Sequence, residues 1–408
     1  MSKLSYLEKL LNEAGVEWKP LGDNRVGEFI RGGGLQKKDF TETGVGCIHY
    51  GQIYTHYGIY ADKTKTFVSE EFAKKARKAK SGDLVIATTS ENDEDVCKAV
   101  AWLGKEDIAV SSDACIYRHN LNPKYVSYFF QTEQFQKQKR PYITGTKVRR
   151  VNADDLSKIP IPIPCPENQK KSLAIQAEIV RILDAFTQLT AELTAELTAR
   201  KKQYDYYREQ LLTFEDGEVE WKPLEDVCSS ISAGGDLPEN YAKGQIQPSD
   251  EFPYPIYANA TGEKGLYGFT DGYKIENDAV TISARGAKIG YHTVREGKFT
   301  PIIRLITLVP NKSVTSTRYL NYILDMTSIG GTDGGIPQLT VPTVKKISVP
   351  IPSLAKQNRI VNILNKFDTL TTSLSEGLPH EIELRQKQYE YYRDLLLNFP
   401  KPEEKQYG

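Results

Sequence analysis

The stretch QKQKRPYITGTKVRR (136–150) gathers lysine and arginine side chains without a single acidic residue. Basic side chains in such a run suit contacts with nucleic-acid phosphates, and arginine can also address a guanine edge in the major groove. One tyrosine and two threonines lie among them. We therefore predict a DNA-binding surface here, with a solvated basic loop as the alternative. The candidate contacts are Lys137, Lys139, Arg140, Tyr142, Thr144, Lys147, Arg149 and Arg150.

Three further stretches carry side chains that suit nucleic-acid contacts. SARGAKIG (283–290) places basic residues after a predicted strand, and its glycines allow close backbone approach to a ligand. GGTDGGIPQLT (330–340) stands where the first half has ITGTKVRR, and HYGQIYTHYG (49–58) mixes His, Gln and Tyr in a predicted strand. The alternatives are a plain turn, a flexible loop without ligand, and strand packing. The candidate contacts are Ser283, Arg285, Lys288, Gln338, Thr340, Gln52, Tyr54 and His56.

Motifs for catalysis are missing from the sequence. There is no G-x-x-x-x-G-K-[ST] phosphate loop and no H-E-x-x-H zinc motif, and GVGCIH (44–49) lacks the third glycine of a dinucleotide fingerprint. NPKY (122–125) lacks the second proline of the adenine-methyltransferase signature and stands at a predicted helix start. Cys47, His49 and His56 have no second cysteine pair with which to form a zinc site. We predict no catalytic residue, metal or cofactor in this chain, so catalysis must come from partners.

Composition sets the class of protein. The chain has 408 residues, too many for one ordinary core, and its 53 basic residues balance 53 acidic ones, so any basic surface must be local. Its cysteines are five in number and far apart, which favours reduced, buried thiols. No apolar run approaches the roughly 18 residues of a membrane span. We expect a soluble, cytoplasmic, multidomain protein.

An internal repeat organises the chain. VEWKPL occurs at 16–21 and 219–224, and KKQYDYYREQLLTF (201–214) matches QKQYEYYRDLLLNF (386–399). Alternating apolar and proline connectors, IPIPIP and SVPIP, precede each predicted long helix. The stretches between the matched parts, roughly 22–155 and 225–343, do not resemble each other. Their short β-branched runs predict two α+β domains of mixed sheet, each with one amphipathic helix, at 122–138 and 315–326.

The two predicted helices carry a heptad seam typical of a coiled coil. A helix from near Lys171 to Leu212 would be about 60 Å long and needs a partner of similar length. The second copy supplies it, with a stutter or kink at EGLPH (376–380). Tyr204, Tyr207, Tyr389 and Tyr392 fall on the seam and are predicted to form the helix or partner interface. The seam positions are Ile179, Leu183, Phe186, Thr190, Leu193, Leu197, Arg200, Tyr204, Tyr207, Leu211 and Phe214, then Ile360, Leu364, Phe367, Thr371, Leu374, Leu378, Ile382, Arg385, Tyr389, Tyr392, Leu396 and Phe399.

The whole pattern resembles the DNA-specificity subunit of type I restriction-modification enzymes, and the tandem TAELTAEL (190–197) resembles the type IC branch. The resemblance implies two target-recognition domains separated by two long antiparallel helices, related by a pseudo-twofold internal repeat. Each domain would bind one half of a split site in double-stranded DNA, and the TAEL units would set the separation.

The resemblance also implies partners and a division of the chain. The helices would dock two methyltransferase subunits and ultimately motor-nuclease subunits, with S-adenosylmethionine, ATP and Mg²⁺ used by those partners. The expected parts are an N-terminal segment and first recognition domain (1–164), a central helix (165–215), a second recognition domain (216–352) and a C-terminal helix and tail (353–408). The competing hypothesis is a coiled-coil adaptor that joins protein-binding domains without touching nucleic acid.

Overall fold

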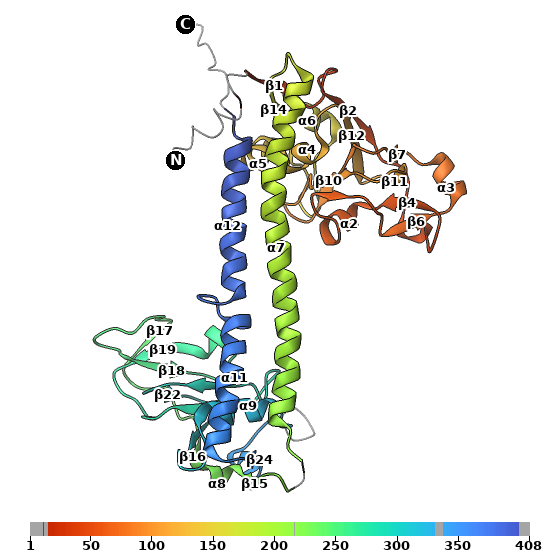
Figure 1. Ribbon diagram of the computed structural model, residues 1–408. Helices are drawn as coiled ribbons and strands as arrows, with labels where there is room; N and C mark the ends of the chain where they lie inside the picture. Colours follow the sequence, from red (N-terminus) through yellow and green to blue (C-terminus); the bar gives the residue numbers. More distant parts are fainter. Residues whose placement is uncertain (1–10, 12–14, 216, 331–337, 400–408) are drawn as a thin grey trace. The chain divides into compact units, whose positions relative to one another are not determined.

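The computed structural model describes Leu11 and residues 15–215, 217–330 and 338–399. It forms two compact units (Figure 1). Unit 1 comprises Met1–Leu193 and Ile382–Gly408, and unit 2 comprises Thr194–Glu381. The boundary falls within α7 (Gln169–Leu212) and close to the start of α12 (Leu378–Leu397), so each unit combines an α/β domain with stretches of long helix.

Unit 1 contains the first α/β domain (residues 16–164). Its helices are α2 (Tyr50–Thr55), α3 (Glu70–Lys75), α4 (Pro123–Phe129), α5 (Glu133–Lys139) and α6 (Ala153–Ser157), with 3-10 turns η1 (Lys37–Asp39) and η2 (Arg140–Tyr142). Its strands are β1 (Val16–Pro20), β2 (Gly27–Arg31), β3 (Phe40–Thr41), β4 (Val45–Ile48), β5 (Tyr60–Ala61), β6 (Thr66–Val68), β7 (Lys78–Ala79), β8 (Leu84–Ala87), β9 (Thr89–Ser90), β10 (Ala99–Trp102), β11 (Ile108–Val110), β12 (Ala114–His119), β13 (Arg149–Arg150) and β14 (Pro160–Pro164).

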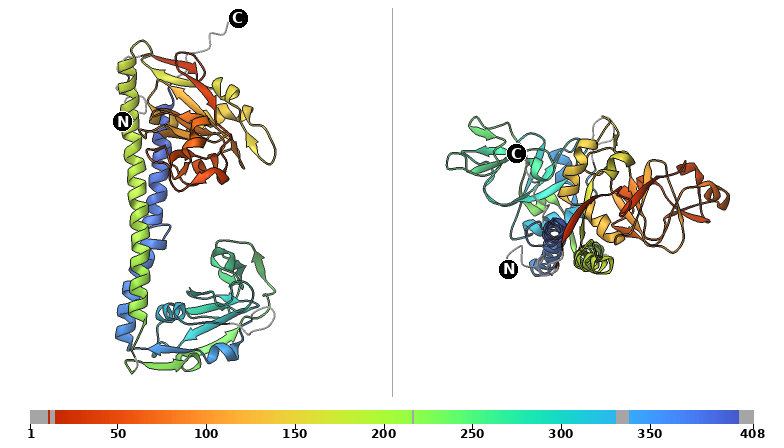
Figure 2. Two further views of the ribbon diagram at one scale, coloured as in Figure 1. Left: turned by 90° about the vertical axis from the view of Figure 1, so that its right-hand side faces the viewer. Right: turned by 90° about the horizontal axis from the view of Figure 1, so that it is seen from above.

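Unit 2 contains the second α/β domain (residues 220–351) and α11 (Leu354–Thr372), against which α9 packs (Figure 2). Its other helices are α8 (Leu224–Val227), α9 (Thr317–Asp325) and α10 (Val341–Lys345), with a 3-10 turn η3 (Gly262–Gly265). Its strands are β15 (Glu220–Pro223), β16 (Cys228–Ala233), β17 (Tyr241–Lys243), β18 (Tyr254–Tyr257), β19 (Leu266–Thr270), β20 (Ala279–Ser283), β21 (His292–Arg295), β22 (Thr300–Pro301), β23 (Leu305–Pro310) and β24 (Ser348–Ile351).

The two α/β domains share one strand order although their sequences do not match, except that the edge strands β5 and β7 of the first domain have no counterpart among the described strands of the second. One sheet has the order β2-β12-β8-β10-β5 in the first domain and β16-β23-β20-β21 in the second. The other has the order β3-β6-β4-β11-β7 and, correspondingly, β17-β19-β18-β22. The β4–β11 and β18–β22 pairs are both parallel, and the remaining matched pairs are antiparallel. The repeat therefore extends through the stretches that sequence comparison leaves unmatched.

The repeated VEWKP and proline-rich motifs are strand partners. β1 runs antiparallel to β14 with Trp18 opposite Pro162, and β15 runs antiparallel to β24 with Trp221 opposite Pro350. Each ribbon has only two strands, so proline residues, which lack a backbone N–H, can stand in it without breaking an inner ladder. The ribbon closes each domain at the point where the chain enters α7 or α11.

A buried glutamine fastens each domain to its helix. Gln176 of α7 accepts a hydrogen bond from the backbone N–H of Asn122, which caps α4 (2.8 Å), and Gln357 of α11 accepts one from Ser316, which caps α9 (3.1 Å). Both glutamines are fully buried. Tyrosines repeat the pattern at the ribbon, where the hydroxyl groups of Tyr125 and Tyr319 donate to the carbonyls of Pro162 and Pro350. We name these paired contacts the glutamine and tyrosine latches.

The helices contact each other at several positions of the predicted seam. In unit 1 the rings of Phe186 and Tyr392 stack with centroids 5.2 Å apart, and in unit 2 Tyr207 stacks on Phe367 at 5.6 Å. Leu374, predicted to lie on the seam, is instead 72% exposed because it falls in the break between α11 and α12. A Cβ at Gly377 would meet the carbonyl oxygen of Thr369 at 2.3 Å, so the break requires glycine. The predicted kink at 376–380 is confirmed.

Two predicted elements differ from the structure. The single amphipathic helix expected at 122–138 is two helices, α4 and α5, because Thr132 caps a new helix by accepting from the backbone N–H of Phe135. The strand expected at 49–58 is helix α2, which His49 caps. His49 accepts from Gly51, and Gln52 returns a bond to the His49 N–H. The predicted burial and free state of the cysteines are confirmed for all of them.

Candidate nucleic-acid interface

In the first domain the C-terminal part of the basic run forms a small hairpin. Thr144 and Arg150 exchange backbone hydrogen bonds of 2.9 Å in both directions, and Gly145 turns the chain with φ of +86°. Arg150 then pairs with Thr89 of β9, which continues the central strand β8. Lys147 and Val148 stand exposed between the ends of the hairpin. We call residues 144–150 the basic hairpin.

The basic hairpin borders a cleft with a second arginine. Arg31, the last residue of β2, lines this cleft together with Arg150 and the hydroxyl residues Thr88, Ser112 and Thr144. In the part of the chain that the structure describes, the side chains of Arg150 and Lys147 form no ion pair or hydrogen bond. The cleft also has two acidic residues, Asp113 and Asp154. Hydroxyl groups and unpaired guanidinium groups in one cleft suit hydrogen bonding to phosphates and base edges.

Lys139 does not belong to this interface, and its predicted DNA contact is wrong. The side chain is 1% exposed, and its ammonium group donates to the carbonyl oxygens of Asp93 (2.8 Å), Glu94 (3.1 Å) and Val96 (2.8 Å). Burial lowers the pKa of Lys139. Lys139 holds the loop that follows β9 from within.

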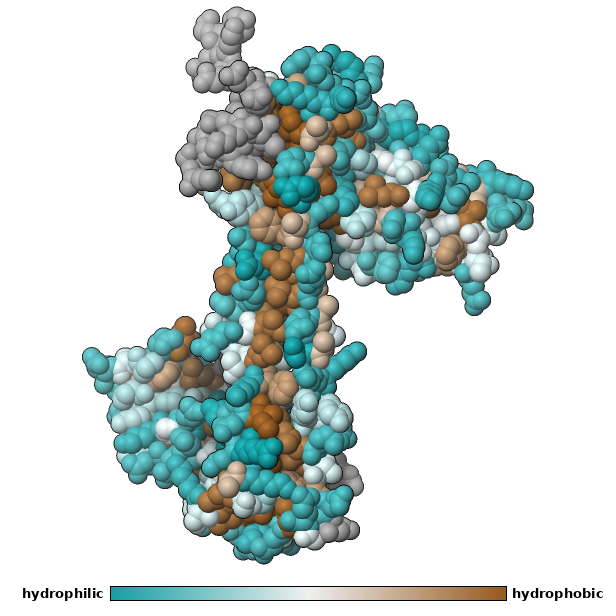
Figure 3. Space-filling model, in the orientation of Figure 1, coloured by the Kyte–Doolittle hydropathy of each residue, from teal (hydrophilic) through white to brown (hydrophobic). Residues whose placement is uncertain are grey.

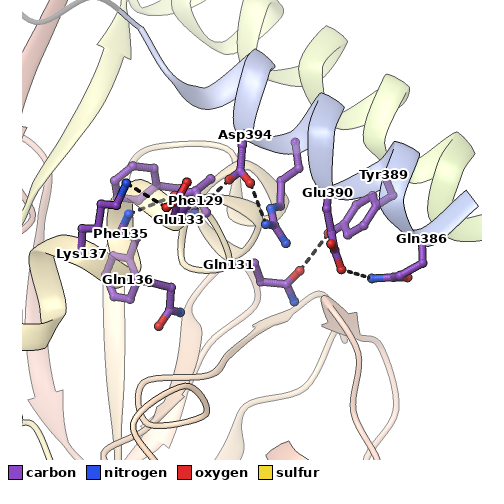
Figure 4. A network of polar contacts seen from close by, with 12 residues as sticks. Phe129, Gln131, Glu133, Phe135, Gln136, Lys137, Gln386, Tyr389, Glu390 and Asp394 are labelled. Carbon is purple, nitrogen blue, oxygen red and sulfur yellow. Dashed lines mark hydrogen bonds and ion pairs between the residues drawn. The ribbon is translucent and has the colours of Figure 1, made fainter. Parts of the chain in front are cut away.

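Lys137 lies on α5, near the contacts of that helix with α12. It forms an ion pair of 2.8 Å with Glu133 on α5, and the Glu133 N–H donates to Asp394 of α12 at 2.9 Å (Figure 4). Next to it, Tyr389 of α12 donates to the side-chain carbonyl of Gln131 at 2.8 Å. The predicted basic run is therefore divided, with its first part beside the helix and its last part in the basic hairpin.

The other residues of the run have mixed surroundings. Arg149 pairs with Asp93 at 2.8 Å and donates to the Gly145 carbonyl at 2.6 Å. Its guanidinium group therefore stabilises the turn of the basic hairpin. Arg140 is exposed in η2, and Tyr142 is half-buried with the Lys158 ammonium 5.6 Å from its ring centroid. Thr144 donates from its hydroxyl group to the Arg150 carbonyl at 3.2 Å.

Two of the three candidates around α2 have structural roles instead. The Gln52 side chain is held on both sides, by the His49 N–H and by the Thr66 hydroxyl group at 3.0 Å each. Tyr54 donates to the Thr89 carbonyl at 2.6 Å, and burial raises its pKa. Tyr54 thus braces the strand that pairs with the basic hairpin, while His56 is exposed at the end of α2.

In the second domain, different side chains occupy the position that corresponds to the basic hairpin and its partner strand. Arg285, just after β20, forms an isolated antiparallel bridge with Gln338, and the Leu339 N–H donates to the Ala284 carbonyl at 2.8 Å. In the first domain Val151 N–H donates in the same way to Thr88, at 3.1 Å. By this hydrogen-bond pattern Gln338 occupies the position of Arg150, and Arg285 that of Thr89. Residues 331–337 of the predicted glycine-rich loop lie outside the described residues.

The remaining candidates of the second domain separate into exposed and structural residues. Ser283 is 1% exposed and cannot reach a ligand, so its predicted DNA contact is wrong. Lys288 is exposed in a turn flanked by Gly286 and Gly290, both with positive φ. Thr340 is the N-cap of α10 and accepts from the Thr343 N–H at 3.3 Å.

Sequence reasoning missed several residues at these two places. Arg31 precedes a Gly-Gly-Gly run, and that run was the available signal. The Gly32 N–H donates to the Ala114 carbonyl at the start of β12, and the Gly33 N–H donates to the Val110 carbonyl at the end of β11. No motif in the sequence marked Asn259, yet its side-chain amide contacts the two residues that follow β20. It donates to the Arg285 carbonyl and accepts from the Ala284 N–H, both at 2.9 Å.

Among the described residues, no three His, Cys, Asp or Glu side chains come together in a way that would hold a metal ion. Within the same residues, no helix combines the length and apolarity needed to cross a membrane.

Comparison with known proteins identifies the family of this two-domain chain. The family model described as the type I restriction modification DNA specificity domain matches twice, at residues 15–200 and 217–384. The chain belongs to this family. It is a specificity subunit, the DNA-recognition component of a type I restriction-modification system.

Relatives match the specificity subunit along its whole length. The type I restriction enzyme EcoR124I/EcoR124II specificity subunit of Escherichia coli is 35% identical, covering 99% of each chain. The putative specificity subunit S.HindORF215P of Haemophilus influenzae is 30% identical, covering 97% of this chain and 98% of its own. Among solved structures, the S subunit from M. genitalium has 14% identity and a TM-score of 0.56, covering 96% of this chain and 98% of that one. These comparisons confirm the predicted family and fold class.

Proposed function

We propose that each α/β domain of this specificity subunit binds one half of a bipartite DNA site, while the helices set the gap between the halves and dock methyltransferase subunits. Methyl transfer then requires a partner that carries S-adenosylmethionine, and motor-nuclease partners use ATP and Mg²⁺. This chain contributes recognition and no catalytic group.

One observation carries the two-reader proposal. Both domains place the end of their central strand beside a returning segment in the same hydrogen-bond pattern, yet the side chains differ, with Thr89 and Arg150 in one and Arg285 and Gln338 in the other. A shared backbone with different polar side chains is what recognition of two different base sequences requires, because bases are distinguished by donor and acceptor pattern.

The helices support the part of the proposal that concerns the gap. α7 continues for 44 residues without a break and contributes to both units, and the TAEL tandem lies inside it. Since an α-helix rises about 1.5 Å per residue, each four-residue unit contributes about 6 Å of length.

Exposed aromatic residues on the helices support methyltransferase docking. Tyr206 and Tyr391 occupy the same position of the repeated YDYYR and YEYYR motifs and are 58% and 47% exposed. Each meets the next tyrosine edge-on, at 5.4 and 5.3 Å between centroids. Apolar residues also reach the surface along the helices (Figure 3), among them Leu189 and Leu384. Exposed tyrosines beside apolar surface are typical of protein interfaces.

Fluorescence anisotropy of the chain reconstituted with its methyltransferase partner on random-sequence duplex tests the proposal. We expect binding that weakens with salt, and Lys147→Ala or Arg150→Ala should each reduce the slope of log affinity against log salt by about 0.9. Lys137→Ala is the matched control, because Lys137 has the same charge but lies beside α12, and it should leave the slope unchanged. Binding that does not respond to salt would favour the adaptor.

A further inference from the structure

A turn in the second domain holds an arginine in a conformation that favours glycine. Arg304 has φ of +68° and is exposed. The other described non-glycine residues in this region of backbone space, Cys97 and Cys165, are both buried, so that packing around them can offset the strain. At an exposed turn, glycine or asparagine would adopt this conformation at lower cost. The strain at Arg304 therefore points to a role for its side chain.

The structure fixes this turn on both sides. Ile302 donates to the Tyr257 carbonyl at 2.9 Å, and the Leu305 carbonyl accepts from Gly234 at 2.6 Å. Between them, the Arg304 carbonyl accepts from Ala284 at 3.0 Å. The turn is therefore rigid at its base, while Ile303 at its tip is 54% exposed.

The turn adjoins the candidate interface of the second domain. Ala284, which binds the Arg304 carbonyl, also binds Asn259 and precedes Arg285, and Arg285 is bridged to Gln338. Backbone bonds thus bring three chain segments together, and they carry two arginines, a glutamine and an exposed isoleucine. In the described chain the Arg304 side chain forms no ion pair or hydrogen bond. The matching turn of the first domain, whose Asp113 carbonyl accepts from Thr88 at 2.9 Å, carries Ser112 and Asp113 instead.

We propose that the Ile303–Arg304 turn determines part of the sequence read by the second domain, with Arg304 donating to a guanine edge and Ile303 packing on a thymine methyl group. The proposal rests on the function proposed above. Arginine is the usual partner of guanine O6 and N7, and apolar side chains contact the thymine methyl. The turn differs from its counterpart in charge and apolarity, as expected of two readers with different half-sites.

Methylation of a randomised duplex library by the complete methyltransferase complex, followed by sequencing of the methylated sites, tests this turn. In Arg304→Lys the charge remains but the paired donors are lost. We expect it to relax the preference for guanine at one position of one half-site, and to slow methylation of the original site by about 5- to 150-fold. Arg304→Gly should have the same effect, and its backbone suits the positive φ, so that folding is retained. Ile303→Ala should weaken a thymine preference in the same half-site.

Arg318→Ala is the control, because it also removes one exposed arginine from the second unit but one that is paired with Glu296. It should leave the consensus unchanged. Two outcomes would overturn base reading by Arg304. One is an unchanged consensus in Arg304→Lys. The other is a uniform loss across all sequences in Arg304→Gly together with a lower salt slope of DNA binding, which would assign Arg304 to a phosphate. Absence of any consensus with the wild-type complex would instead refute the proposed function.

Discussion

Replacing Lys139 by methionine separates a buried structural lysine from a DNA contact. Methionine keeps the length of the side chain but leaves the carbonyls of Asp93, Glu94 and Val96 without their shared donor. Each unsatisfied buried carbonyl costs about 1–3 kcal/mol, and loss of a desolvated charge offsets part of that sum. We expect the free energy of unfolding of the first unit to fall by about 3–5 kcal/mol, the sum for three carbonyls less the part that is offset.

Urea unfolding followed by tryptophan fluorescence, to which Trp18 and Trp102 of the first unit contribute, measures this loss in a Trp221→Phe background. The salt slope of DNA binding, measured in native conditions, should not change because the ammonium group does not reach solvent. Lys147→Met is the converse control, with stability changed by no more than about 0.5 kcal/mol and a slope lower by about 0.9. The opposite pattern, a lower slope with full stability in Lys139→Met, would refute the structural role.

Two further predictions concern pH and the spacer. Burial lowers the pKa of His119 from 6.5 to about 4. Between these pH values His119 binds a proton only in the unfolded chain. The free energy of unfolding of the first unit should therefore fall by up to about 3 kcal/mol as the pH decreases through this range. His119→Asn should remove that part of the acid sensitivity in urea titrations at neutral and acidic pH, and an equal pH response would contradict the assignment. Deleting Thr194–Leu197 shortens α7 by about 6 Å and rotates the remainder of the helix by about 40°. We expect the complex to methylate sites with the same half-sites but a gap shorter by one or two base pairs, and methylome sequencing that finds an unchanged gap would show that the tandem does not set it.

The features that local sequence determines were predictable. The heptad pattern predicts a helix from near Lys171 to Leu212, and α7 runs from Gln169 to Leu212, because helical periodicity is visible within a few turns. The glycine and proline of EGLPH marked the break before α12 in the same way. The strands at 113–119 and 278–286 were also predicted, from β-branched runs that end in turns.

The features that depend on distant contacts were not predictable. Lys139 was assigned to DNA because its own neighbours are basic, whereas the carbonyls that bury it lie more than 40 residues earlier in the chain. The common topology of the two domains was hidden for the same reason, since strand pairing is non-local and the paired side chains have diverged. Residues 49–58 were predicted to form a strand, whereas the capping bonds between His49 and Gln52 stabilise helix α2 there.

The latches have a consequence for how such a protein acquires new targets. Gln176 and Gln357 hold their domains through backbone N–H groups, and Tyr125 and Tyr319 donate to backbone carbonyls of the proline ribbon. These four bonds use backbone groups of the domain and do not depend on the side chain at that position, although Gln357 also accepts from the Thr315 hydroxyl group. A different domain can form the same bonds if it meets three conditions. It begins with a VEWKP strand, it ends with a proline-rich strand, and it keeps one tyrosine on the helix that corresponds to α4 or α9. Exchange of a whole domain at these two short motifs would therefore leave these contacts with the helices intact.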